Sequence, residues 1–306
     1  MLGQLHEALK ILKIEGHTQH CLVVKVTNGC YLRCEHCYEE SGLETRDAGI
    51  NVAMVAKAAK GLTNWLMCLQ GGEPMEFPEK CREIVEIGRK NNMMTMLVTS
   101  GFWIRDQKLC DFVLEKIRPM YLTFSINEWT SKHVPIEDIN LMAELLKDRR
   151  DIVMFGSSVY GYTPDMTAED NDFQKLDKSQ KKINEQLRHR FFRTPVPLIS
   201  RGRASRLDDR VPRFEVRDAR IECNCGGITL DVDGSLYANC PNVKFGCRFG
   251  KLDDYKTLND LADRIHKPRW IVNGCTFGAA EICRKVGANC LDPKWADSKY
   301  IERAEV

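Results

Sequence analysis

The stretch that decides the fold is Cys30-Tyr31-Leu32-Arg33-Cys34-Glu35-His36-Cys37, which places three cysteines in a C-x3-C-x2-C pattern. Three thiolates this close together can converge on one inorganic centre, whereas a structural zinc ion or a passive iron–sulfur cluster needs four protein ligands. Three ligands leave one coordination position open for a molecule that binds and reacts. The apolar run 22–27 and the turn-forming Asn28-Gly29 come just before, so we expect the cysteines to follow the carboxyl end of a first strand.

Three more polar motifs follow strand-like runs farther along the chain. They are Gly71-Gly72-Glu73-Pro74 after the run 65–70, Thr99-Ser100-Gly101 after 94–98, and Ser125-Ile126-Asn127 after 122–124. Reactive centres of α/β barrels lie at this end of the strands. Each motif is therefore a candidate for the same kind of site as the cysteines.

In this order the motifs resemble the signature of the radical S-adenosylmethionine (radical SAM) enzymes. In that family three cysteines hold a [4Fe–4S] cluster and SAM binds the fourth iron. The resemblance implies Cys30, Cys34 and Cys37 as cluster ligands, and it implies SAM contacts at His36, Gly72, Glu73, Thr99, Ser125 and Asn127. His36 would lie near the adenine, Gly72 and Glu73 near the methionine ammonium group, and Ser125 and Asn127 near the ribose. Relatives usually carry aspartate where Asn127 stands.

Other interpretations of these motifs stay open. The three cysteines could form a zinc knuckle with His36 or a distant cysteine as fourth ligand. Disulfides need an oxidising compartment, but residues 1–14 have an amphipathic helical period and no signal-peptide pattern. Gly71-Gly72 alone would be an ordinary turn, and the hydroxyls of Thr99 and Ser125 could simply cap the helices that follow.

Composition sets the broad class of the protein. The chain has 306 residues, a formal net charge of +2 and 43% hydrophobic residues, which is enough for one large core with a small appendage. A near-neutral charge argues against general nucleic-acid binding, and no apolar run is long enough for a membrane span. The 14 cysteines without an export signal indicate a reducing compartment, so we expect a cytoplasmic protein.

Strand-like and helix-like runs alternate up to about residue 200, which predicts an α/β fold with a parallel sheet and right-handed crossovers. The predicted strands are 22–27, 65–70, 94–98, 122–124, 151–157 and 196–199, and Pro197 indicates an edge position for the last. The predicted helices begin near Asp47, Pro78, Asp106 and Ile136, with another over residues 1–14. The resemblance implies that residues 1–200 form the partial (β/α)6 barrel of radical SAM enzymes.

Residues 201–306 form a predicted second, cysteine-rich domain. Apolar residues alternate around Asp233-Gly234, which predicts a β-hairpin with a cysteine near each outer end. With the preceding Gly202-Arg203-Ala204, this segment resembles the SPASM or twitch auxiliary domains, although the C-x2-C run of a full SPASM domain is absent. The resemblance implies one auxiliary [4Fe–4S] cluster, held by Cys225, Cys240 and two ligands from Cys247, Cys275, Cys283 and Cys290. A zinc site or free thiols are the alternatives.

The resemblance also implies a reaction. A reduced cluster passes one electron to SAM, and the 5′-deoxyadenosyl radical that forms abstracts hydrogen from a C–H bond. We expect a flavodoxin- or ferredoxin-type electron donor and a small-molecule substrate derived from a sugar, nucleoside or amino acid, because the short stretch before the first strand leaves no room for a separate leader-binding domain. A peptide- or protein-modifying maturase is the alternative. A non-enzymatic iron–sulfur electron carrier or zinc-binding interaction module would not need a SAM pocket.

Overall fold

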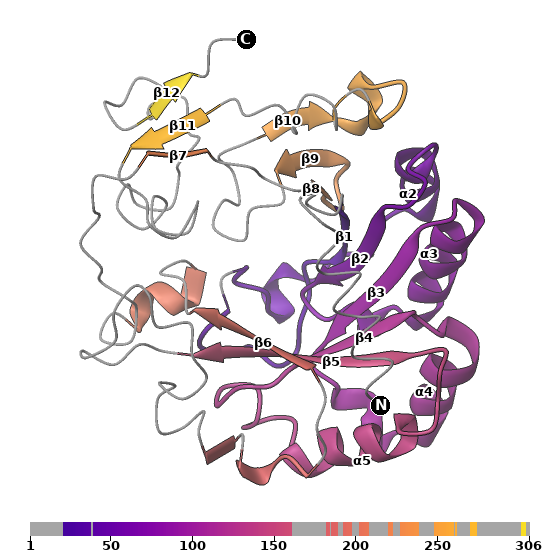
Figure 1. Cartoon of the computed structure of the whole chain (residues 1–306), viewed down its shortest axis with the longest axis vertical. Helices are drawn as coiled ribbons and strands as arrows, with labels where there is room; N and C mark the ends of the chain where they lie inside the picture. Colours follow the sequence, from indigo (N-terminus) through magenta and orange to yellow (C-terminus); the bar gives the residue numbers. More distant parts are fainter. Residues whose placement is uncertain are drawn as a thin grey trace.

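In the computed structural model, most of the described strands form one nine-stranded sheet in the order β10-β9-β8-β1-β2-β3-β4-β5-β6 (Figure 1). The described residues are 21–37, 39–160, 182–183, 185–188, 192–197, 202–207, 220–222, 227–238, 248–259, 261, 270–273 and 301–303. The strands of the large sheet are β1 (Cys21–Thr27), β2 (Leu66–Gly71), β3 (Met94–Thr99), β4 (Tyr121–Ser125), β5 (Val153–Tyr160), β6 (Phe192–Pro197), β8 (Gly227–Leu230), β9 (Ser235–Ala238) and β10 (Arg248–Lys251). A second, three-stranded sheet contains β7 (Arg220–Glu222), β11 (Trp270–Asn273) and β12 (Ile301–Arg303).

Strands β1 to β6 pair in parallel with their sequence neighbours, so the predicted mixed α/β class with a parallel sheet is confirmed. Each of these strands overlaps a strand predicted from the sequence. Strand β6 lies at one edge of the described sheet, as Pro197 led us to expect. The common direction brings the carboxyl ends of β1 to β4, and therefore the four motifs, to one edge of the sheet.

The helices after β1 to β4 lie along one face of the curved sheet in Figure 1. They are α2 (Val52–Ala59), α3 (Pro78–Lys90), α4 (Gln107–Phe112) and α5 (Ile136–Leu146), and a π-helical turn, Val113–Ile117, continues α4. Alternate residues of β1, namely Leu22, Val24 and Val26, are fully buried and share one hydrophobic core with buried side chains of the helices. Pro78 occupies the first turn of α3, where its missing N–H costs nothing.

The prediction that the first of these helices starts near Asp47 is wrong. Helix α2 begins at Val52, and the side chain of Asn51 caps it by accepting a hydrogen bond from the Ala53 N–H. Asp47 instead accepts hydrogen bonds from residues at the end of β1. An aspartate suits a helix cap and a loop anchor equally well, and the sequence does not say which backbone N–H groups lie nearby.

The cysteine-rich part of the sequence contributes strands to the same sheet. Strand β8 pairs in parallel with β1, and β8 and β9 pair antiparallel across the turn at Asp233-Gly234, where Gly234 has a φ of +79°. The boundary between residues 200 and 201 stays a prediction, as does an auxiliary domain beyond it. The predicted helix over residues 1–14 and the cysteines from Cys223 onward lie outside the described residues. Among the described helices, none has the length and apolar character needed to cross a membrane.

Candidate active site

The segment 28–42, which we call the cysteine loop, starts at the end of β1. Asp47 fixes that start. The Asp47 carboxylate accepts hydrogen bonds from Thr27 Oγ1 at 2.8 Å and from the Asn28 N–H at 2.9 Å. Farther along, the Cys30 N–H donates to the carbonyl of Gly42 at 3.2 Å and so closes the loop at its base. These bonds hold the strand end and the far side of the loop together.

The three thiols of the loop lie in one partly buried environment. Cys34 is buried, Cys30 and Cys37 are half-buried, and none of them forms a disulfide. Burial raises the pKa of Cys30 to about 11 and that of Cys34 to about 12, and the charges of the neighbouring loop cysteines add to both shifts. The three thiols therefore lie close enough to influence one another.

The Gly-Gly-Glu-Pro motif packs directly on the first residues of the cysteine loop. The Gly72 N–H donates to the Thr27 carbonyl at 2.8 Å, and the Glu73 N–H donates to the Gly29 carbonyl at 2.9 Å. A Cβ atom on Gly72 would lie 1.8 Å from the Gly29 carbonyl oxygen, a backbone atom. Only glycine fits at Gly72, because the two backbones approach so closely.

Glu73 is buried, with 1% of its surface exposed, and its carboxylate accepts four hydrogen bonds from neighbouring residues. Its Oε1 accepts from Thr99 Oγ1 at 2.7 Å and from the Met75 N–H at 3.1 Å. Its Oε2 accepts from the Ser100 N–H at 2.9 Å and from Ser100 Oγ at 2.6 Å. Burial raises the pKa of Glu73, and these donated bonds oppose that effect. Glu73 thus joins the ends of β2 and β3.

The end of β4 reaches the cysteine loop through Asn127 and His36. Asn127 Oδ1 accepts hydrogen bonds from the N–H groups of Trp129 at 3.1 Å and Thr130 at 3.0 Å, and its Nδ2 lies 3.5 Å from His36 Nε2. The imidazole of His36 stacks on Trp129 with ring centroids 4.8 Å apart. Burial, helped by the charge of Arg203, lowers the pKa of His36 to about 4, so the ring is neutral at neutral pH.

The predicted SAM-contacting residues therefore divide into two groups. The carboxylate of Glu73, the hydroxyl of Thr99 and the amide oxygen of Asn127 are engaged by neighbouring strand ends and turns. The side chains of His36 and Ser125 make fewer contacts of this kind. His36 Nδ1 is buried without a hydrogen-bond partner in the described part of the chain, and Ser125 is half-buried at the end of β4. The contacts of all these residues with SAM stay predictions.

Sequence reasoning missed three residues that contact the cysteine loop or the residues beside it. Trp129 stacks on His36, Lys25 Nζ lies 2.6 Å from Glu39 Oε2, and Arg203 binds loop carbonyls. The available signals were a lone lysine in the apolar strand β1 and an arginine within the recognised Gly-Arg-Ala segment. The proposed auxiliary-cluster ligands Cys225, Cys240, Cys247, Cys275, Cys283 and Cys290 lie outside the described residues.

The residues around the loop fit the cofactors that the sequence resemblance implies. Three thiols on one loop provide the donors for a cluster, and the buried, unpartnered His36 Nδ1 is the kind of atom that a bound polar molecule would satisfy. In the described ranges, no group of three His, Cys, Asp or Glu side chains is placed to bind one single metal ion. In a [4Fe–4S] cluster each cysteine binds a different iron, so its ligands do not meet at one point.

The chain is similar to known proteins in part of its sequence and in its fold. No family model matches the chain. The PqqA peptide cyclase of Gluconobacter oxydans (strain 621H) is 32% identical over 91 residues, which is 29% of this chain, and the match spans only a quarter of that relative's length.

Two solved structures have a similar fold. One is anSMEcpe with bound AdoMet and Cp18Cys peptide, with a TM-score of 0.50, 16% identity and coverage of 81% of this chain and 83% of that one. The other is Streptococcus suis SuiB bound to the precursor peptide SuiA, with a TM-score of 0.51, 11% identity and coverage of 86% and 69%. At these identities the likeness shows the fold of the chain, and the radical SAM resemblance of its strand-end motifs stays a prediction from the sequence.

Proposed function

We propose that this chain is a radical SAM enzyme that modifies a peptide or protein side chain, with Cys30, Cys34 and Cys37 as the ligands of its [4Fe–4S] cluster. The observation that carries the proposal is the meeting of the cysteine loop, the Gly72-Glu73 turn and the end of β4 at one edge of the parallel sheet. Radical SAM chemistry needs its cluster and SAM side by side, and strand ends of this kind are where α/β barrels place reactive groups.

The chain's own residues would bind, orient and enclose the cofactors. When bound, the cluster and SAM supply one-electron cleavage of a carbon–sulfur bond and a 5′-deoxyadenosyl radical that abstracts hydrogen. Gly72 and Glu73 are the proposed contacts of the SAM methionine, Ser125 and Asn127 those of the ribose, and His36 that of the adenine. Thr99 is a further proposed SAM contact. Residues 201–306 would hold an auxiliary cluster, and an external flavodoxin- or ferredoxin-type protein would be the electron donor.

The choice of a peptide over a small molecule reverses the preference drawn from the sequence. The relative in sequence described above is named as a cyclase of the PqqA peptide. The two solved structures of similar fold contain a peptide, Cp18Cys in one and the precursor SuiA in the other. These observations support the maturase alternative more than a sugar, nucleoside or amino-acid substrate.

The first test is SAM cleavage by the anaerobically reconstituted chain. We expect about four irons per chain for one cluster, or about eight with an auxiliary cluster, and release of 5′-deoxyadenosine after addition of dithionite and SAM. Cys30→Ala should abolish that release. Cys110→Ala, which removes a buried thiol on α4 far from the loop in sequence, is the matched control and should retain it. Full 5′-deoxyadenosine release by Cys30→Ala would refute the proposal.

The second test identifies the substrate class by mass spectrometry. Short peptides encoded beside the gene should increase 5′-deoxyadenosine release, and their mass should change. Free sugars, nucleosides and amino acids, assayed in parallel, should do neither. Turnover of one of these small molecules, with every peptide unchanged, would restore the small-molecule interpretation and end the peptide proposal.

A further inference from the structure

Arg203 contacts the cysteine loop from a position more than 160 residues later in the sequence. It lies in the short helical turn Gly202–Arg206, where the neighbouring Ala204 is fully buried in the core. The Leu207 N–H donates to the Ala204 carbonyl at 3.0 Å and closes this turn. The turn is thus packed in place, and Arg203 is the residue that it presents to the loop.

Three hydrogen bonds join Arg203 to three separate points of the cysteine loop. Its Nε donates to the Cys34 carbonyl at 2.9 Å, its Nη2 to the Ser41 carbonyl at 2.7 Å, and its backbone N–H to the Cys37 carbonyl at 3.1 Å. Two of these carbonyls belong to cysteines of the triplet. A planar guanidinium can bind two carbonyls at once in a fixed geometry, and a lysine ammonium cannot reproduce that geometry.

The guanidinium of Arg203 lies at carbonyls of the cysteine loop and has no carboxylate partner in the described part of the chain. In the described part of the chain, the hydrogen bonds of Arg203 all go to loop carbonyls, and no Asp or Glu pairs with it. By contrast Arg33, which lies inside the triplet, points outward: its side chain is 70% exposed and lies 3.9 Å from Glu44. A half-buried, unpaired positive charge interacts more strongly with nearby negative charge than an exposed one does.

We propose that Arg203 is a positioning residue for the cysteine loop: it holds the loop in the shape that directs the three thiolates at one cluster, and its charge favours the more negative, reduced state of that cluster. The inference rests on the proposed function, because it needs the cluster to be present. Hydrogen bonding and net charge around an iron–sulfur cluster are among the factors that set its reduction potential, and residues that orient metal ligands influence how tightly the metal is held.

The test compares Arg203→Gln, Arg203→Lys and the matched control Arg33→Gln, each reconstituted anaerobically as the full chain. The readouts are iron per chain, the rate of iron loss to a chelator, and the midpoint potential followed by electron paramagnetic resonance. Arg203→Gln should lose iron about 10- to 100-fold faster than the unmodified chain and show a lower potential. Arg203→Lys should keep a near-normal potential, because the charge remains, but should still lose iron faster. Arg33→Gln should behave like the unmodified chain.

Urea unfolding of the cluster-free chains separates loop positioning from a general loss of folding. The inference predicts that Arg203→Lys unfolds at nearly the same urea concentration as the unmodified chain while its loaded form loses iron faster. Normal iron retention in both Arg203 variants would overturn it, and so would iron loss that simply follows a fall in global stability. If the unmodified chain takes up no iron, the proposed function fails instead, so the two failures are distinguishable.

Discussion

At the scale of single residues, Glu73 shows how a motif residue can act as a structural tie. Its carboxylate lies between the ends of β2 and β3 and receives four hydrogen bonds, from Met75, Thr99 and Ser100. Each carboxylate oxygen accepts two of these bonds, which fixes the orientation of the side chain. Thr99 in turn accepts a hydrogen bond from Trp103 Nε1 at 3.0 Å, which extends the tie into the residues after β3.

We therefore predict that Glu73→Gln destabilises the chain even without cofactors. The amide keeps one acceptor oxygen but turns an NH2 group toward two of the donors, and hydrogen bonds to a buried charged group are worth roughly 1.5–3 kcal/mol. We expect a loss of about 2 kcal/mol in the free energy of unfolding, measured by urea denaturation of the cluster-free chain. Glu79→Gln, at a 65% exposed side chain on α3, is the control and should change little. Identical unfolding curves for all three proteins would show that Glu73 has no structural role.

At the scale of elements, a buried lysine joins three segments that are distant in sequence. Lys25 lies on β1, on the face opposite to Val24 and Val26, and is 5% exposed. Its Nζ is 2.6 Å from Glu39 Oε2, which follows the cysteine triplet, and 3.6 Å from Asp231 Oδ2, which follows β8. One charge on the first strand thus holds the cysteine loop and the β8–β9 turn together.

Replacing Lys25 with methionine should remove the cation that pairs with both carboxylates. Removal of one partner from a buried ion pair typically costs about 3–5 kcal/mol, so we expect Lys25→Met to lower the free energy of unfolding by about this amount. Lys57→Met is the matched control, because Lys57 is 42% exposed and solvent screens its ion pair with Asp253, so little stability should be lost. Chemical denaturation of the two variants provides the comparison, and equal losses would contradict a special role for the buried lysine.

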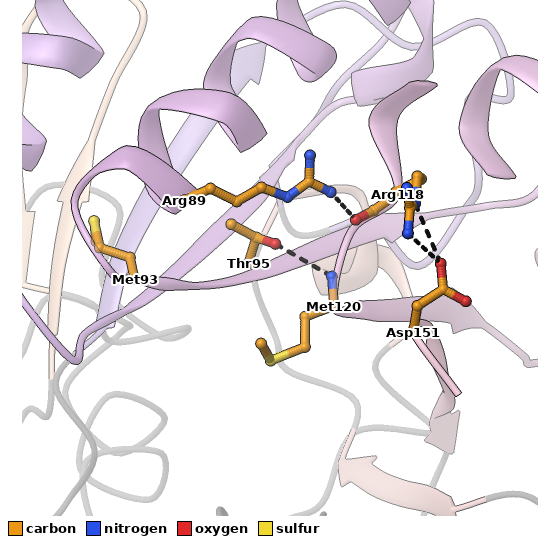
Figure 2. A pocket seen from close by; sticks show the side chains of 6 residues that line it. All are labelled: Arg89, Met93, Thr95, Arg118, Met120 and Asp151. Atoms are coloured by element: carbon orange, nitrogen blue, oxygen red, sulfur yellow. Dashed lines mark hydrogen bonds and ion pairs between the residues drawn. The ribbon is translucent and has the colours of Figure 1, made fainter. Parts of the chain in front are cut away.

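At the scale of the whole molecule, different features lie at the two ends of the parallel strands. The carboxyl ends of the strands carry the candidate active site. Near the amino ends of β3 to β5 lies a pocket of about 400 Å³, shown in Figure 2, whose lining residues are Arg89, Met93, Thr95, Arg118, Met120 and Asp151. There Arg89 donates to the carbonyls of Ile117 and Arg118, and Arg118 pairs with Asp151 at 3.2 Å. These contacts link the segments that lead into β4 and β5.

The ion pairs around Asp151 should make stability depend on pH in the acid range. Hydrogen bonding from Arg149, with help from Arg118, lowers the pKa of Asp151 to about 2. Because an unfolded aspartate titrates near 3.9, the ionised group should stabilise the fold above about pH 4, and this contribution should disappear as the pH falls toward about 2. Its size should be at most about 1 kcal/mol, since the side chain is partly exposed. In urea titrations at several pH values, Asp151→Asn and Arg149→Gln should both flatten this dependence, and an unchanged slope in Arg149→Gln would contradict the assignment.

The sequence predicted much of the frame of this molecule for local reasons. Apolar runs and turn residues located all six parallel strands, and Pro78 and Asp106 marked the starts of α3 and α4. The cysteine triplet and the three strand-end motifs could be found because each is contiguous. The start of α2 was placed wrongly at Asp47, since the partners of that carboxylate lie on β1 and not in a helix. The pairing of β8 with β1 was not predicted either, because it joins segments about 200 residues apart and leaves no local signal.

By itself, the sequence determined the strand–helix alternation, the common edge of the motifs and the close spacing of three thiols, because spacing and residue type are properties of the chain. Only the tertiary structure decided which side chains form hydrogen bonds and ion pairs around the motifs at that edge. It assigned Glu73 to Thr99 and Ser100, Lys25 to Glu39 and Asp231, and Arg203 to the carbonyls of the cysteine loop. The physical reason is that a buried charge or carbonyl must find a partner wherever packing brings one, and packing is set by the whole chain.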